Sequence, residues 1–161
     1  RYLDESFKRE ILRAERRDST IAVLMMDVDH FKTLNDSLGH DAGDFVLQQL
    51  STIITSRVRG EDIACRFGGE EFILVLPDAD IDSTIKRAEE LLSAIREANL
   101  QFKNRPVGQV TVSIGIALFP KHGNSQDGLI AAADSALYAA KEGGRDQVRV
   151  NGEVFERDAT T

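Results

Sequence analysis

The stretch CRFGGEEFILVLP, residues Cys65–Pro77, decides the fold. Two apolar runs flank Gly68 and Gly69, and adjacent glycines take the positive φ angles of a tight hairpin turn. Glu70 and Glu71 follow the glycines, and alternation along the second strand points these two side chains to opposite faces. A bare backbone beside two carboxylates suits a metal–phosphate site. An ordinary hairpin with a polar tip is the alternative that this stretch alone leaves open.

The composition indicates one globular domain with a buried core. The chain has 161 residues, of which 42% are hydrophobic and 29% charged, as in soluble proteins. No apolar run reaches the roughly 20 residues that cross a bilayer. The net charge of −7 argues against a nucleic-acid partner, because a phosphate backbone needs a basic surface. The single cysteine, Cys65, excludes an internal disulfide and fits a reducing compartment.

Apolar periodicity places the elements along the chain. Helical spacing predicts helices over residues 2–17, 31–38, 41–59, 82–98 and 126–141. Apolar runs and alternation predict strands over residues 21–28, 62–67, 71–76, 109–119 and 147–150. The first strand is apolar on both faces and is therefore expected at the centre of the sheet. This order predicts an α+β fold in which helices flank a mostly antiparallel five-stranded sheet. Residues 1–150 form the core of this single domain, and 151–161 form a polar tail that we expect to be frayed.

Two acids stand at the ends of apolar strands. Asp27 closes the first strand, and Glu70 opens the second strand of the hairpin. If these strands pair, the two carboxylates meet at one edge of the sheet. Together with the Val28 carbonyl they would suit Mg²⁺ carrying a nucleotide phosphate. Two unrelated, solvated strand ends are the alternative.

The following segment offers groups for a nucleotide. Phe31 and Lys32 open a helix, whose free N–H groups can hold phosphate oxygens. Asn35 and Asp44 bracket a Gly-His-Asp-Ala-Gly loop. A carboxylate can accept from both N1–H and N2–H of guanine, whereas adenine presents the opposite pattern, so such a pair would select guanine. The alternative is structural, with Asp41 as an N-cap and Asp44 as a first-turn acid.

Two cations close the last long helix. Lys141 and Arg145 are explained either by the helix dipole or by a clamp on terminal phosphates. The three histidines show no zinc-ligand spacing, and the chain has no Walker-type glycine loop followed by Lys-Ser or Lys-Thr.

Several spaced motifs together resemble the GGDEF domain, the catalytic domain of bacterial diguanylate cyclases. They are MMDVDHFKTLND, GHDAGDFVL, RGEDIACRFGGEEF, TVSIGIA and ADSALYAAKEGGR, in this order over about residues 1–150. The signature reads GGEEF, a variant that active members also carry. The resemblance implies the nucleotidyl cyclase and polymerase palm fold. Because the chain begins at Arg1, we expect an upstream sensory or receiver domain to be missing. We place the domain in the cytoplasm, alone or as the cytoplasmic part of a membrane-anchored sensor, without membrane contact of its own.

The resemblance implies a role for each matching residue. Mg²⁺, with Mn²⁺ as an alternative, would be held by Asp27, the Val28 carbonyl and Glu70. Guanine would be read by Asn35 and Asp44, with His40 in the same pocket. The triphosphate would lie against the amides near Phe31 and Lys32, the bare backbone of Gly69, and the side chains of Lys141 and Arg145. Lys32 would also offset charge at the α-phosphate. Glu70 or Glu71 would take the hydroxyl proton, and Glu70 is favoured because it lies beside the metal.

The implied reaction joins two GTP molecules. The 3′-hydroxyl of one GTP attacks the α-phosphate of the other and pyrophosphate leaves, and repetition in the reverse sense gives cyclic di-GMP. Each domain would bring one GTP, so a homodimer is needed. One rival is a catalytically weak regulatory domain that binds GTP or cyclic di-GMP, against which the complete residue set speaks. A second is a cyclase for mixed dinucleotides, against which Asp44 speaks. A third is a structural domain that docks partners, and the sequence has no exposed apolar stripe that would support it.

A separate motif implies control by the product. Arg59 and Asp62, at the predicted end of a helix, match the RxxD product-inhibition site of the family. Many members supply a further arginine from the next helix, but Glu90 stands at that position here. Arg87 is the substitute on the same helix, so we expect weak inhibition. A salt bridge at a helix end is the alternative.

Overall fold

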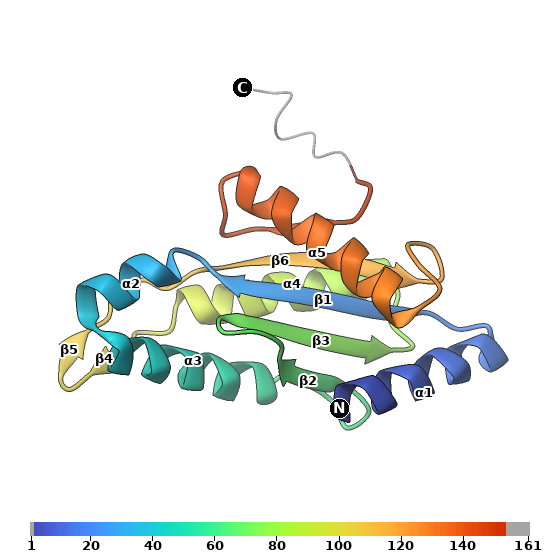
Figure 1. Cartoon of the computed structure of the whole chain (residues 1–161), viewed down its shortest axis with the longest axis horizontal. Helices are drawn as coiled ribbons and strands as arrows, with labels where there is room; N and C mark the ends of the chain where they lie inside the picture. Colours follow the sequence, from blue (N-terminus) through green and yellow to red (C-terminus); the bar gives the residue numbers. More distant parts are fainter. Residues whose placement is uncertain (1, 154–161) are drawn as a thin grey trace.

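A five-stranded sheet between helices forms the domain, in the strand order β2-β3-β1-β6-β7 (Figure 1). The structure is a computed structural model and describes residues 2–153. The strands of this sheet are β1 (Ile21–Val28), β2 (Ile63–Arg66), β3 (Glu71–Pro77), β6 (Val112–Phe119) and β7 (Val148–Val150). The helices are α1 (Tyr2–Arg17), α2 (Phe31–Leu38), α3 (His40–Thr55), α4 (Ile81–Arg96) and α5 (Gln126–Glu142). Neighbouring strands are antiparallel except for the parallel pair β6–β7, so the predicted fold class is confirmed.

Strand β1 is the centre of the sheet, as its sequence predicts. All eight of its residues are buried. Alternate side chains enter two separate cores, because successive residues of a strand point to opposite faces. Leu24 and Met26 pack in the core that α3 and α4 cover, whereas Val23 and Met25 pack in the core that α1 and α5 cover. Among the described helices, none is long and apolar enough to span a bilayer.

The hairpin turn differs from its prediction. Neither Gly68 nor Gly69 has a positive φ angle. The strands are joined by a four-residue loop, residues 67–70, and the Phe67 amide donates to the Glu71 carbonyl over 2.8 Å. The Arg66 guanidinium donates to the Gly69 carbonyl over 2.6 Å. A four-residue loop reverses the chain without left-handed residues. The predicted tight Gly-Gly turn is therefore wrong, whereas the predicted hairpin is confirmed.

Other differences lie at the end of α3, after α4 and in the tail, and the strand predicted from residue 109 begins at Val112. Helix α3 ends at Thr55 rather than at Arg59, because its last turn tightens through short-range bonds such as Val58 N–H to the Thr55 carbonyl. The predicted loop after α4 contains two strands, β4 (Gln101–Phe102) and β5 (Arg105–Pro106), too short to show alternation. The expected frayed tail lies largely outside the described residues. Its first residue, Asn151, is held by the Ile116 and Ala132 carbonyls over 2.8 and 3.0 Å.

Helix α5 lies unusually close to the sheet at Gly115. A Cβ at this position would overlap with two backbone atoms of α5, the Ala133 carbonyl oxygen and the Leu137 amide nitrogen. Backbone atoms of a packed helix cannot move aside as a flexible side chain can. Gly115 therefore sets the depth at which α5 packs on β6.

We predict that Gly115→Ala lowers the free energy of unfolding by about 1–3 kcal/mol, because the added methyl group overpacks the contact. Gly60→Ala is the matched control, since a Cβ there has no atom within 4 Å, and it should stay within about 0.5 kcal/mol of wild type. Urea denaturation of the three proteins measures the difference. Equal midpoints for Gly115→Ala and Gly60→Ala would show that α5 is not held at this depth.

Candidate active site

An acidic cluster lies where β1 and β3 end side by side. Asp27 is the register partner of Glu71, and paired residues of antiparallel strands share a face. Glu70 lies in the preceding loop, outside the strand alternation, and its carbonyl accepts from the Val28 amide over 3.3 Å. The structure therefore brings the predicted ligands Asp27, Val28 and Glu70 to one edge of the sheet. The expected placement of the two glutamates on opposite faces does not apply, because Glu70 precedes the strand.

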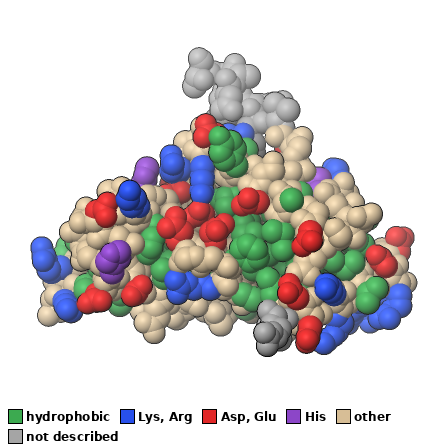
Figure 2. Space-filling view, in the orientation of Figure 1, with side chains coloured by type: hydrophobic (Ala, Val, Ile, Leu, Met, Phe, Trp, Pro, Cys, Tyr) green, Lys and Arg blue, Asp and Glu red, His purple; other side chains and the backbone are tan. Residues whose placement is uncertain are grey.

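The carboxyls of this cluster perturb one another. The pKa of Glu70 is raised, first by burial and then by the charge of Asp27. The pKa of Glu71 is raised by burial, and further by Asp27 and by Asp134 from α5. Figure 2 shows acidic side chains gathered beside basic ones near this end of the sheet. Burial and mutual repulsion thus disfavour the charged forms of both glutamates.

Lys141 reaches this cluster from the end of α5. Its ammonium forms an ion pair with one carboxylate oxygen of Asp27, whose side chain is 8% exposed. The other oxygen, Asp27 Oδ1, is buried without a hydrogen-bond partner. Within residues 2–153, no three His, Cys, Asp or Glu side chains form a metal-binding group. Two carboxylates and a backbone carbonyl nevertheless remain as hard oxygen donors, and the orphaned oxygen is one that a hard cation would satisfy.

The start of α2 offers free backbone N–H groups beside the cluster. His30 stands before the helix in a left-handed conformation, with a φ of 54°, and no side chain caps the helix. Phe31 is buried and anchors the first turn, whereas Lys32 is exposed. An uncapped helix start can hold an anion through its amides. The predicted phosphate-binding groups therefore lie just past the end of β1.

The residues expected to read a base lie on α2 and α3. Only Gly39 separates these helices, so His40 and Asp44 belong to α3 and are both exposed. Gly39 is the N-cap, and Asp41 lies in the first turn with no capping bond. The alternative in which Asp41 caps the helix is therefore wrong, and the predicted Gly-His-Asp-Ala-Gly loop is helical from His40 onward. Asp44 lies beyond the first turn, which weakens the interpretation of this residue as a dipole-stabilising acid.

Gly43 is a residue of this region that sequence reasoning missed. A Cβ there would overlap with Oδ1 of Asn35, an atom that is buried without a hydrogen-bond partner. The missing side chain gives Asn35 its place between the two helices. A glycine inside a helical pattern was the available signal. A separate cavity of about 390 Å³ lies between residues 37–42 and the β4–β5 hairpin, and His40 lines it.

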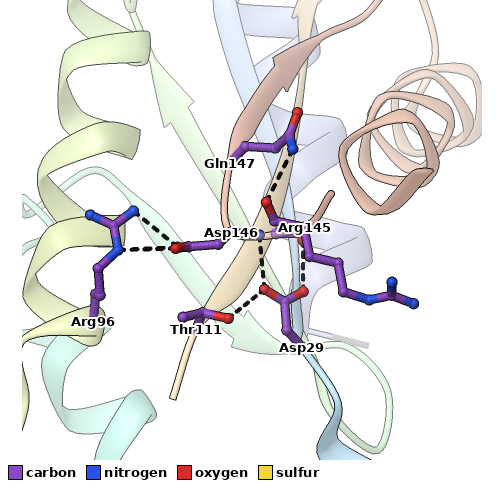
Figure 3. Close-up of polar contacts among 7 residues, drawn as sticks. Asp29, Arg96, Thr111, Arg145, Asp146 and Gln147 are labelled. Atoms are coloured by element: carbon purple, nitrogen blue, oxygen red, sulfur yellow. Dashed lines mark hydrogen bonds and ion pairs between the residues drawn. The ribbon is translucent and has the colours of Figure 1, made fainter. Parts of the chain in front are cut away.

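Arg145 lies in the loop after α5 and is exposed. Arg145 and Asp146 have φ angles of 62° and 48°, which is uncommon for residues other than glycine. The Asp146 amide donates to the carboxylate of Asp29 over 3.0 Å, and Arg96 from α4 pairs with the Asp146 side chain (Figure 3). Sequence reasoning missed this network, because its members are up to 117 positions apart.

The RxxD residues line a cavity of about 270 Å³ together with Arg87 and Glu90. Arg87 donates to Asp62 over 2.8 Å, and the Asp62 side chain is 2% exposed. The Arg59 amide donates to the same carboxylate oxygen over 2.8 Å. The structure therefore brings Arg59, Asp62 and Arg87 together. They lie in the loop after α3 and on α4, not at the predicted end of a helix.

Comparison with known sequences identifies relatives along nearly the whole chain. The family model described as diguanylate cyclase, GGDEF domain, matches residues 1–147. The diguanylate cyclase DosC of Escherichia coli is 40% identical over 150 residues, which cover 93% of this chain and 32% of that protein. The chain spans about a third of the length of the curated relatives DosC, diguanylate cyclase A of Treponema denticola and PleD of Caulobacter vibrioides.

Solved structures agree with the sequence comparison. The GGDEF domain of DgcB from Caulobacter crescentus, solved in complex with c-di-GMP, superposes with a TM-score of 0.88 at 32% identity, covering 94% of this chain and 86% of that one. The active GGEEF domain of a diguanylate cyclase from Vibrio cholerae superposes with a TM-score of 0.86 at 27% identity, covering 95% and 96%. Sequence motifs, fold and relatives thus agree, and the chain belongs to the GGDEF domain family of diguanylate cyclases.

Proposed function

We propose that this domain condenses two GTP molecules into cyclic di-GMP and two pyrophosphates, as the catalytic part of a diguanylate cyclase. The observation that carries the proposal is the cluster of Asp27, Glu70 and Lys141 beside the uncapped start of α2. Carboxylates, a cation and free amides at one strand end are the groups that bind and activate a nucleotide triphosphate. The names of DosC and of the Vibrio cholerae domain, which carries the same GGEEF signature, support the same activity.

Membership of the family implies dependence on a divalent metal, and we propose Mg²⁺, with Mn²⁺ as the alternative. Asp27, the Val28 carbonyl and Glu70 would hold it. Such an ion would supply charge neutralisation at the phosphates. The raised pKa of Glu70 fits this assignment, because a neighbouring cation would favour the charged carboxylate that burial and Asp27 disfavour.

The chain's own cations and amides would bind and orient the triphosphate. The amides at Phe31 and Lys32 and the backbone at Gly69 would contact its oxygens. Lys141 and Arg145 would pair with the outer phosphates, and Lys32 would offset the charge that grows at the α-phosphate. Positioning of this kind can supply a large share of the rate.

The attacking 3′-hydroxyl must lose a proton. Glu70 is our candidate acceptor, because it would lie beside the metal, and Glu71 is the alternative. Each domain holds one such site, so two copies must face each other to bring a hydroxyl to the second α-phosphate. We therefore propose a homodimer as the catalytic form.

The direct test incubates the purified domain with GTP and Mg²⁺ and identifies the products by mass spectrometry. Cyclic di-GMP and pyrophosphate are expected. Tight GTP binding without product would instead identify the regulatory domain that binds nucleotide and does not turn it over. A product containing adenine from mixed GTP and ATP would contradict the assignment of two guanines.

We predict that Glu70→Gln lowers the initial rate at least about 100-fold, because a neutral amide neither accepts the proton nor contributes charge for the metal. Glu15→Gln, an exposed acid on α1, is the matched control and should keep the wild-type rate. Melting temperatures show whether both variants are folded. Near-normal turnover in Glu70→Gln would remove Glu70 from the catalytic groups.

We predict that Asp44→Ala weakens GTP binding at least about tenfold and removes the preference over ATP, because the guanine donors lose a charged acceptor. Asp41→Ala is the matched control, since Asp41 is an exposed acid of the same helix that lies in its first turn. Calorimetric titration with both nucleotides measures the change. If the two variants bind GTP alike, Asp44 contributes only to the helix.

We propose weak product inhibition at the cavity that Arg59, Asp62 and Arg87 line, since the related DgcB domain was solved with c-di-GMP. A guanidinium can bind a phosphate or the base, and Asp62 would have to exchange its bond from Arg87 or from the Arg59 amide for the guanine donors. Glu90, in the same cavity, repels phosphate.

Arg59→Ala should raise the half-inhibitory concentration of cyclic di-GMP at least about tenfold. The rate of each variant is compared with its own rate without added product. Arg57→Ala, an exposed arginine that contributes its carbonyl rather than its side chain to Arg87, is the matched control. Progress curves with added product measure the effect. An unchanged inhibition constant in Arg59→Ala would show that the Arg59 side chain does not bind the product, and would leave the Arg87–Asp62 ion pair as a structural contact.

A further inference from the structure

The loop after α5 adopts a conformation that needs support. Arg145 and Asp146 are consecutive residues in the left-handed region, with φ angles of 62° and 48°. Residues with a Cβ are disfavoured in this region, and they keep such φ angles only where surrounding contacts hold them. They follow Gly143 and Gly144, which end the helix. The contacts that fix this loop therefore determine where the Arg145 side chain lies.

Asp29 holds the backbone of the loop from the side of the sheet. It is 8% exposed, and its carboxylate accepts three hydrogen bonds. Two come from the hydroxyls of Thr111 and Ser113, each over 2.7 Å. The third comes from the Asp146 amide over 3.0 Å. Asp29 therefore ties the loop to the segment that enters β6 and to the strand end that carries Asp27.

Arg96, on α4, holds Asp146 through its side chain. It is the last residue of α4, and its guanidinium donates from Nε and Nη2 to the Asp146 carboxylate over 3.1 and 3.0 Å. A two-pronged guanidinium–carboxylate pair fixes orientation as well as distance. The Gln147 side chain adds a bond to the Arg145 carbonyl over 3.0 Å. Asp146 is thus held through both its backbone and its side chain (Figure 3).

With Asp146 engaged in this way, the neighbouring Arg145 side chain points away from the Arg96–Asp146 pair, as Figure 3 shows. It is exposed, and the chain that leads to it leaves α5 just after Lys141, whose ammonium contacts Asp27. We propose that Arg96 and Asp29 are positioning residues, which hold the loop so that Arg145 meets the outer phosphates of GTP. This inference rests on the proposed triphosphate contact of Arg145.

The experiment compares two ligands that differ in the outer phosphates. The probes are GMP and a GTP analogue with an α,β-methylene bridge, which cannot release pyrophosphate. Arg96→Met keeps the apolar stem of the side chain and removes the bonds to Asp146. It should weaken binding of the analogue about tenfold and that of GMP less than twofold. Arg96→Lys, which retains the charge, should recover part of the lost binding of the analogue. It replaces Arg96→Met in the experiment if Arg96→Met does not fold.

One double variant and a matched control separate positioning from stability. Arg145→Ala should weaken the analogue selectively, and adding Arg96→Met to it should cause no further loss. Arg13→Met, which removes a surface arginine paired with Glu10 on α1, should bind both ligands as wild type does. Asp29→Asn, which retains the shape of the side chain, should reproduce the selective loss of Arg96→Met. Calorimetry gives the dissociation constants, and melting temperatures report the fold.

The outcomes are distinguishable from failure of the proposed function. If Arg96→Met weakens GMP as much as the analogue, or adds its full effect to Arg145→Ala, the residue only stabilises the domain and this inference is overturned. If Arg145→Ala binds the analogue as wild type does, the triphosphate contact itself is wrong. If wild type binds neither ligand, the proposed function fails before Arg96 is in question.

Discussion

The close packing of α5 on β6 at Gly115 is the constraint on which the candidate active site depends. Helix α5 brings Lys141 to the Asp27 carboxylate, and the loop that follows it carries Arg145. The carbonyl of Ala133 and the amide of Leu137 occupy the space that a side chain on the strand would need. If α5 were displaced from β6 by the width of a methyl group, the far end of the helix would move relative to β1. The missing side chain on a buried strand therefore sets the distance between the anions of the sheet and the cations beyond it.

The charges that meet at this point are unequal, and the imbalance indicates what the site accepts. Asp27, Glu70 and Glu71 share a partly buried region with the ammonium of Lys141. Burial and mutual repulsion raise the pKa values of both glutamates, while Lys141 lowers them to a smaller extent. A region of this kind favours an added cation over an added anion. The proposed triphosphate would therefore bind most favourably together with the proposed divalent metal.

The main sheet could be predicted from the sequence, but the contacts between distant loops could not. The unbroken apolar run of residues 21–28 and the alternation before Phe119 reflect burial, which acts on every residue, so strands and fold class could be predicted. The pairing of β1 with β3 places Glu71 opposite Asp27, and the loop that enters β3 adds Glu70 beside them. The φ angles of Gly68 and Gly69 depend on loop length and on the Arg66 bond, which composition does not record. The Arg96–Asp146 pair joins positions 50 apart on elements whose packing no local pattern specifies.

The exposures of the two partners in the central ion pair differ, and this difference decides which of them can respond to a ligand. The Asp27 side chain is 8% exposed and belongs to a strand paired on both sides, so it has no room to move. The Lys141 side chain is 32% exposed and ends a flexible stem at the end of a helix. Lys141 can therefore leave Asp27 for another partner by rotation of its side chain alone, while the paired strand keeps the acid in place.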